Sequence, residues 1–100
     1  MNRKMPNLPR RLREGLDEAD DLLSKYKQPE EALELLQDLN KHYPRQADVL
    51  GIMANTYLDL GDKRGYLNTM YKLHKIMPNR GDVKFGLAGA YLSNGRFALA

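Results

Sequence analysis

The chain has 100 residues, of which 42% are hydrophobic and 29% are charged, and its net charge is +3. These values are typical of a single soluble folded domain, and no segment approaches the about 20 apolar residues that a membrane-spanning helix needs. The chain contains no cysteine, which excludes disulfides, thiolate metal sites and a cysteine nucleophile and fits a cytoplasmic protein.

The charge is unevenly distributed along the sequence. Residues 1–13 carry five basic side chains and no acidic one, whereas residues 14–34 carry eight acidic and two basic side chains. Residues 1–9 also contain two prolines and two asparagines without a periodic apolar pattern. We therefore expect a flexible basic leader over residues 1–11, which runs directly into an acidic helix.

The first two helices are predicted from apolar side chains that recur every three or four residues. The first spans residues 12–26. The second begins at Pro29, whose missing N–H costs nothing in a first turn, and stops before Pro44. The apolar positions are Leu12, Leu16, Ala19, Leu22 and Leu23 in the first helix, and Ala32, Leu33, Leu35, Leu36 and Leu39 in the second.

The same periodicity predicts four further helices. The third should end at Gly61, and Asp62 is a suitable N-cap for a fourth, which ends before Pro78. A fifth helix is expected from about Asp82 to Asn94, and a sixth begins near residue 96. Tyr57, Tyr91, Met53, Met70 and Met77 lie at helical spacing and are predicted to belong to the core.

The sequence repeats with a period of 34 residues. The matching pairs are Leu39 and Leu73, Pro44 and Pro78, Val49 and Val83, Ala54 and Ala88, Tyr57 and Tyr91, Leu58 and Leu92, and Gly61 and Gly95. A period of this length indicates stacked helix pairs, each of which buries its apolar surface against its neighbours.

These residues resemble the tetratricopeptide repeat, a 34-residue helix–turn–helix with small, aromatic, glycine and proline positions at this spacing. The resemblance covers residues 13–100, as repeats over 13–46 and 47–80 and a truncated one over 81–100. It implies an all-α, right-handed superhelical stack of antiparallel helix pairs. Because the last repeat is incomplete, we expect an excerpt from a longer protein, whose catalytic part could lie elsewhere, or completion by another copy.

The chain departs from the family pattern at three positions. Lys27 replaces the turn glycine of the first repeat, and Asp20 replaces its small residue. Tyr66 stands where a small side chain usually lets two helices approach closely. The third and fourth helices are therefore expected to be splayed, or Tyr66 to be turned into a neighbouring gap.

In this family the first helix of each pair lines a concave groove that holds a peptide or a helix. The resemblance carries this role onto Glu14, Asp17, Asp21, Asp48, Asn55, Asp59, Phe85 and Leu92, with Ser24, Gly51, Leu58, Asp82, Gly89 and Ser93 beside them. A groove that is acidic at one end and apolar at the other favours a partner with basic and apolar residues. The alternative is that these acids only form a solvated face.

The basic residues Arg3, Lys4, Arg10, Arg11 and Arg13 are the second candidate site. Such an arm can bind nucleic acid or an anionic surface, but it has no aromatic stacking partners, so a disordered leader is favoured. His42 and His74 have no metal-ligand spacing, and no phosphate-binding or nucleophile motif is present.

The sequence therefore predicts a protein-binding module or scaffold with no enzymatic activity, cofactor or metal, which binds a peptide or helix of another protein. The first alternative is a homodimer formed through the C-terminal end, with Tyr91, Leu92, Phe97 and Leu99 at the contact. Electrostatic binding of nucleic acid through the arm is the second alternative and is disfavoured.

Overall fold

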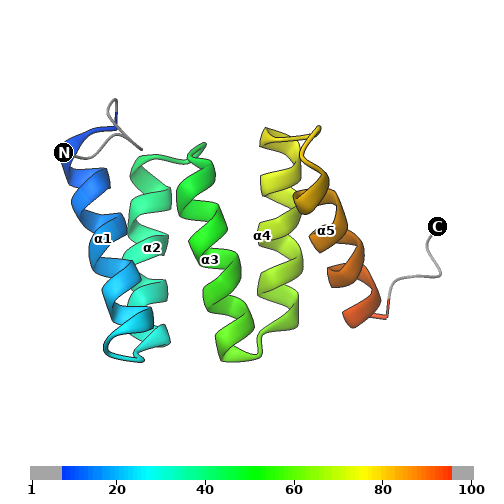
Figure 1. The fold of residues 1–100 in the computed structure, drawn as a ribbon, viewed down its shortest axis with the longest axis horizontal. Helices are drawn as coiled ribbons and strands as arrows, with labels where there is room; N and C mark the ends of the chain where they lie inside the picture. Colours follow the sequence, from blue (N-terminus) through cyan, green and yellow to red (C-terminus); the bar gives the residue numbers. More distant parts are fainter. Residues whose placement is uncertain (1–7, 96–100) are drawn as a thin grey trace.

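The computed structural model describes residues 8–95, and within them it contains five α-helices and no strand (Figure 1). The helices are α1 (Arg10–Ser24), α2 (Pro29–His42), α3 (Ala47–Leu60), α4 (Lys63–Ile76) and α5 (Gly81–Ser93). Each helix packs on the next, and α1 also contacts α3. This all-α arrangement, which the sequence predicts, is compatible with a helical repeat. The predicted sixth helix lies outside the described residues.

The first helix begins at Arg10, two residues earlier than the sequence predicts, so Arg10, Arg11 and Arg13 belong to α1. The guanidinium of Arg10 lies 3.0 Å from the Glu14 carboxylate one turn later. This part of the expected leader is therefore a helical turn. Arg3 and Lys4 lie outside the described residues.

Local chemistry accounts for the boundaries between helices. Pro29 occupies the first turn of α2, as predicted. Gly61 ends α3 in the left-handed conformation, with φ of 73°, and the N–H of Asp62 donates to the Tyr57 carbonyl at 2.9 Å. The Asp62 carboxylate then accepts a hydrogen bond from the Gly65 N–H at 2.9 Å, which confirms it as the N-cap of α4.

One continuous apolar core runs through all five helices. Val49 and Leu50 of α3 are 0% and 2% exposed and lie near its centre. The buried hydroxyls of Thr56 and Thr69 donate to carbonyls one turn earlier, so neither is left unsatisfied. The core residues are Leu12, Leu16, Ala19, Leu36, Leu39, Val49, Leu50, Met53, Ala54, Met70, Leu73 and Val83.

A glycine brings α4 close to α3. A Cβ atom at Gly65 would overlap the ring of Tyr57, so only glycine permits this approach. The Tyr57 hydroxyl, in turn, accepts a hydrogen bond from the Gln37 side chain of α2 at 3.5 Å. Since one tyrosine touches both helices, α2 and α4 lie on the same side of α3.

The helices α3 and α4 remain in contact. The side chain of Tyr66 is turned toward α5, the second of the two arrangements expected from the sequence. Its hydroxyl lies beside Gly86 of α5, where a Cβ atom would come within 3.3 Å of the oxygen. The same Cβ atom would lie 2.6 Å from the terminal methyl of Met70, so Gly86 makes room chiefly for Met70 and also for Tyr66.

The predicted core residues divide into two groups. Met53 and Met70 are buried, and Tyr57 and Met77 are partly buried against the core. Tyr91 is different, because it lines an open hollow instead of joining the core cluster. The prediction was wrong for Tyr91 since no helix of the described chain covers α5 as α4 covers α3.

Lys27 adopts φ of 54°, in the left-handed region that side chains with a Cβ atom disfavour. We expect Lys27→Gly to stabilise the protein by about 0.5–1 kcal/mol, because relief of this strain outweighs the added chain entropy of glycine. Thermal unfolding followed by circular dichroism should show a rise in Tm of several degrees, about 4 °C.

Lys25→Gly is the matched control, because Lys25 has helical backbone angles, with φ of −88° and ψ of −47°. This variant should not gain stability, because glycine adds chain entropy at this position and relieves no strain. A Lys27→Gly variant that is no more stable than the parent protein contradicts the strain at this turn.

Candidate functional site

The three odd-numbered helices expose the same side to solvent. On this side, two residues 34 positions apart are similarly exposed: Leu58 of α3 at 54% and Leu92 of α5 at 60%. We call this surface the odd-helix face. It consists of Glu14, Asp17, Asp21 and Ser24 on α1, Asp48, Gly51, Asn55, Leu58 and Asp59 on α3, and Asp82, Phe85, Gly89, Leu92 and Ser93 on α5.

The part of the odd-helix face on α5 is apolar. Phe85 is 83% exposed, and Leu92 follows it after seven residues, or about 10.5 Å along the same side of the helix. Leu58 of α3 adds a third exposed apolar side chain. Exposed large apolar residues on one face are typical of surfaces that bind a partner.

The odd-helix face is less acidic than the sequence suggests. Three carboxylates of the face have basic partners: Glu14 pairs with Arg10 at 3.0 Å, Asp21 with Lys25 at 3.9 Å, and Asp82 with Arg80 at 2.8 Å. Sequence reasoning missed Lys25 and Arg80. Both ion pairs could have been predicted from the spacing of the residues in the sequence. Lys25 follows Asp21 by one helical turn, and Arg80 comes just before the first turn of α5, which contains Asp82.

Three other carboxylates of the face have no basic partner within residues 8–95: Asp17, Asp48 and Asp59. Asp48 and Asp59 are eleven residues apart on α3, a separation of about 16 Å along the helix. Asn55 and Leu58 lie between them in sequence on the same face. The strip along α3 can therefore pair with basic groups at both ends and contact an apolar group between them.

A small hollow of about 190 Å³ opens between the C-terminal halves of α3 and α5. Tyr66 of α4 lines it together with Leu58 and Ser93 of the odd-helix face. This hollow could not be predicted from sequence, because it depends on the direction that Tyr66 takes between helices. The remaining lining residues are Tyr57, Gly61, Asp62 and Lys63.

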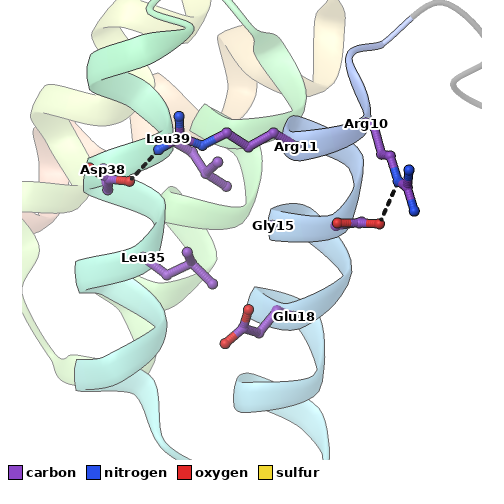
Figure 2. Close-up of a pocket in the computed structure, with 8 residues that line it drawn as sticks. Arg10, Arg11, Gly15, Glu18, Leu35, Asp38 and Leu39 are labelled. Atoms are coloured by element: carbon purple, nitrogen blue, oxygen red, sulfur yellow. Dashed lines mark hydrogen bonds and ion pairs between the residues drawn. The ribbon is translucent and has the colours of Figure 1, made fainter.

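A larger hollow of about 590 Å³ lies between α1 and α2 (Figure 2). Leu35 and Leu39 of α2 form its apolar part, and Gly15 of α1 allows Leu39 to come close. Figure 2 shows Arg11 reaching across to Asp38, whose carboxylate lies 3.6 Å from the guanidinium. Arg10 and Glu14 at the rim are also paired, at 3.0 Å, whereas Glu18 makes no ion pair among the described residues.

The two histidines do not form a metal centre in the described part of the chain. The Nδ1 atom of His42 lies 3.0 Å from the Asp38 carbonyl, whereas the buried Nδ1 atom of His74 has no hydrogen-bond partner. Among residues 8–95, no group of three or more His, Asp or Glu side chains could hold a metal ion. Within the same residues, no helix is both long and apolar enough to cross a membrane.

Comparison with known proteins leaves the family open. No protein-family model matches the sequence. A search of the curated proteins also finds no match. Function is therefore inferred from the side chains described above.

The Arg80–Asp82 pair at the start of α5 gives a pH-dependent prediction. The hydrogen bond from Arg80 lowers the pKa of the Asp82 carboxyl from its ordinary value. The stabilisation from this pair is therefore present above the ordinary aspartate pKa and is lost as the pH falls through the lowered one. Carboxyl NMR titration should show the low midpoint of Asp82, and Arg80→Gln should raise it.

Arg45→Gln is the control, because Arg45 lies in the loop before α3 and makes no ion pair among the described residues. It should leave the titration of Asp82 unchanged. An Asp82 midpoint that does not move in Arg80→Gln contradicts this account of the pair.

Proposed function

We propose that this chain is a non-catalytic protein-binding module that holds a peptide or helical segment of another protein along the odd-helix face. The observation that carries the proposal is the exposure of Phe85, at 83%, on the same face as Leu58 and Leu92. Side chains of this size stay in water at a cost unless a partner covers them. Their alignment along repeat-equivalent positions supports one elongated partner.

The resemblance to the tetratricopeptide repeat supports the same site. The helix pairs follow one another in the order that this family implies, with Gly61 at one turn and Pro78 after α4. We infer a right-handed superhelical stack in which the odd-helix face is concave. In that family the first helix of each pair lines the groove, and α1, α3 and α5 are the first helices here.

The charges of the face indicate the chemistry of the partner. Asp17, Asp48 and Asp59 favour a ligand with lysine or arginine residues, and the apolar side chains favour leucine or phenylalanine between them. Tetratricopeptide proteins that clamp a C-terminal carboxylate use basic residues at positions where α1 carries Asp17 and Asp21. A carboxylate-terminated ligand is therefore disfavoured.

The hollow beside Tyr66 supplies an anchor position within this surface. Its volume of about 190 Å³ is lined on one side by Leu58, next to the strip on α3. An apolar side chain of the ligand enters it, and the neighbouring acids hold basic residues at the rim. With few such anchors and a flexible ligand to order, the expected affinity is about micromolar.

A second candidate function is self-association through the C-terminal end. A hollow of about 290 Å³ on α5 is lined by Leu87, Ala88 and Tyr91 together with Lys84 and His74. On α3 the equivalent residues are covered by α4, so this side of α5 offers a helix-sized contact. Of the residues that the sequence assigned to this contact, Phe97 and Leu99 lie outside the described part.

The groove proposal is tested by NMR titration with a helical peptide that carries leucines at spacings of three, four and seven residues, flanked by lysines. Shifts should concentrate at Asp48, Asn55, Phe85 and Leu92. Phe85→Ala should weaken binding about tenfold or more, because a buried aromatic anchor contributes over 1 kcal/mol at an interface. Folding should be unaffected, since Phe85 contributes little to the core.

Tyr26→Ala is the matched control, because Tyr26 is also aromatic and 60% exposed but lies in the loop between α1 and α2, outside both the odd-helix face and α4. It should leave the affinity for the peptide unchanged. Shifts confined to other surfaces, or equal losses in both variants, would contradict the groove. A mass that rises with concentration and falls in Ala88→Glu would instead support the C-terminal contact.

A further inference from the structure

The two even-numbered helices also expose equivalent residues, on a surface separate from the odd-helix face. On α2 the exposed residues form an acidic stripe: Glu30, Glu34, Gln37, Asp38 and Lys41. On α4 they form a basic stripe: Arg64, Asn68, Tyr71, Lys72 and Lys75. Successive members are one to four residues apart, so each stripe follows one side of its helix.

The stripes carry opposite charges at the same positions of the repeat. Arg64 stands 34 residues after Glu30, and Lys72 stands 34 residues after Asp38. The helix α4 contains four lysine or arginine residues and no acid, whereas α2 contains four acids and one lysine. The repeat therefore keeps the helix and its outward side but reverses the charge at two of the five stripe positions.

The two stripes lie on the same side of the molecule and run in the same direction. Tyr57 of α3 contacts both Gln37 of α2 and Gly65 of α4, which places both helices on one side of α3. Figure 1 shows α2 and α4 as nearly parallel columns, which lie to the left and to the right of α3 in this view. Both helices follow an oppositely directed partner, so their chain directions agree.

These charges are not neutralised between the two helices. Asp38 pairs with Arg11 of α1 at 3.6 Å and with His42 at 3.8 Å, and it remains about half exposed. The Lys75 ammonium lies 5.1 Å from the centre of the Tyr71 ring, on its own helix. Among residues 8–95, no ion pair joins α2 to α4.

We propose that a second copy of this chain docks on this surface, with the acidic stripe of each copy against the basic stripe of the other. A two-fold axis parallel to the helices, lying between the copies, places α2 opposite the α4 of the second copy with the same direction and height. Glu30 then faces Arg64, and Asp38 faces Lys72. Gln37 faces Tyr71, which is 46% exposed and lies at the centre of the contact.

The second copy fits this surface because the repeat gives both stripes the same length and spacing. A nucleic acid fits less well, since the acidic stripe on α2 would repel its phosphates beside the basic one. An unrelated acidic protein could pair with α4 but would leave the α2 stripe without a partner. Only a self-complementary contact satisfies both stripes in one interface.

One pair in this arrangement is unfavourable. Lys41 faces Lys75 at the end of the stripes, so like charges meet there. Because exposed ion pairs are individually weak and are screened by salt, the dimer is weak and dissociates as ionic strength rises. The arrangement therefore predicts both the salt dependence and a single substitution that strengthens the dimer.

The test is sedimentation velocity over a range of protein concentrations at about 20 mM and about 500 mM salt, where charges are weakly and strongly screened. Two double variants should each be monomeric, because all facing charges then repel. The first combines Arg64→Glu with Lys72→Glu, and the second combines Glu30→Lys with Asp38→Lys. An equimolar mixture of the two double variants should restore a heterodimer, in which the substituted positions attract again while Lys41 and Lys75 still repel. Circular dichroism establishes that each variant is folded.

Lys41→Glu provides the gain-of-function arm, because it replaces the like-charge pair with an attractive one at Lys75. It should lower the dimer Kd severalfold at low salt. Phe85→Ala, on the odd-helix face, should leave the dimer unchanged, which separates this contact from the proposed groove. A parent protein that is monomeric at low salt, or a mixture of double variants that stays monomeric, overturns the proposal.

Discussion

The contact between Gly65 and the Tyr57 ring is the constraint on which the rest of the structure depends. Glycine lets α4 lie directly against α3, and the hydroxyl of the same tyrosine reaches Gln37 of α2. This contact fixes three helices relative to one another. The next residue, Tyr66, is turned toward Gly86 of α5. Tyr57 and Tyr66 both line the hollow beside the odd-helix face, so this close approach lies at its wall.

Equivalent residues of the repeat have different environments where a following helix covers one of them and leaves the other uncovered. Leu50 and Ala54 are buried because α4 covers that side of α3, whereas Lys84 and Ala88 are exposed at the same positions of α5. The side that carries Leu58 and Leu92 is exposed on both helices, whatever packs beside them. A surface that stays open in every unit is the one on which an elongated partner can lie, which is the physical basis of the proposed groove.

The helices and their ends could be predicted from sequence because their causes are local. The glycine at 61 and the cap at Asp62 act within one turn, so their residue types alone identify them. The direction of Tyr66, the separation of Tyr91 from the core cluster and the partner of Asp82 depend on neighbouring helices or loops. These features needed the three-dimensional packing, and the acidity of the candidate site was overestimated for the same reason.

The two proposed surfaces influence each other through charge. A ligand with basic residues on the odd-helix face is attracted by Asp48 and Asp59 but repelled by the lysines and arginines of α4, which packs against α3. Part of that repulsion acts within a Debye length of about 10 Å at moderate salt. Pairing of the α4 stripe with the acids of a second copy neutralises it, so dimerisation favours ligand binding. Because such coupling is reciprocal, a basic ligand in turn favours the dimer.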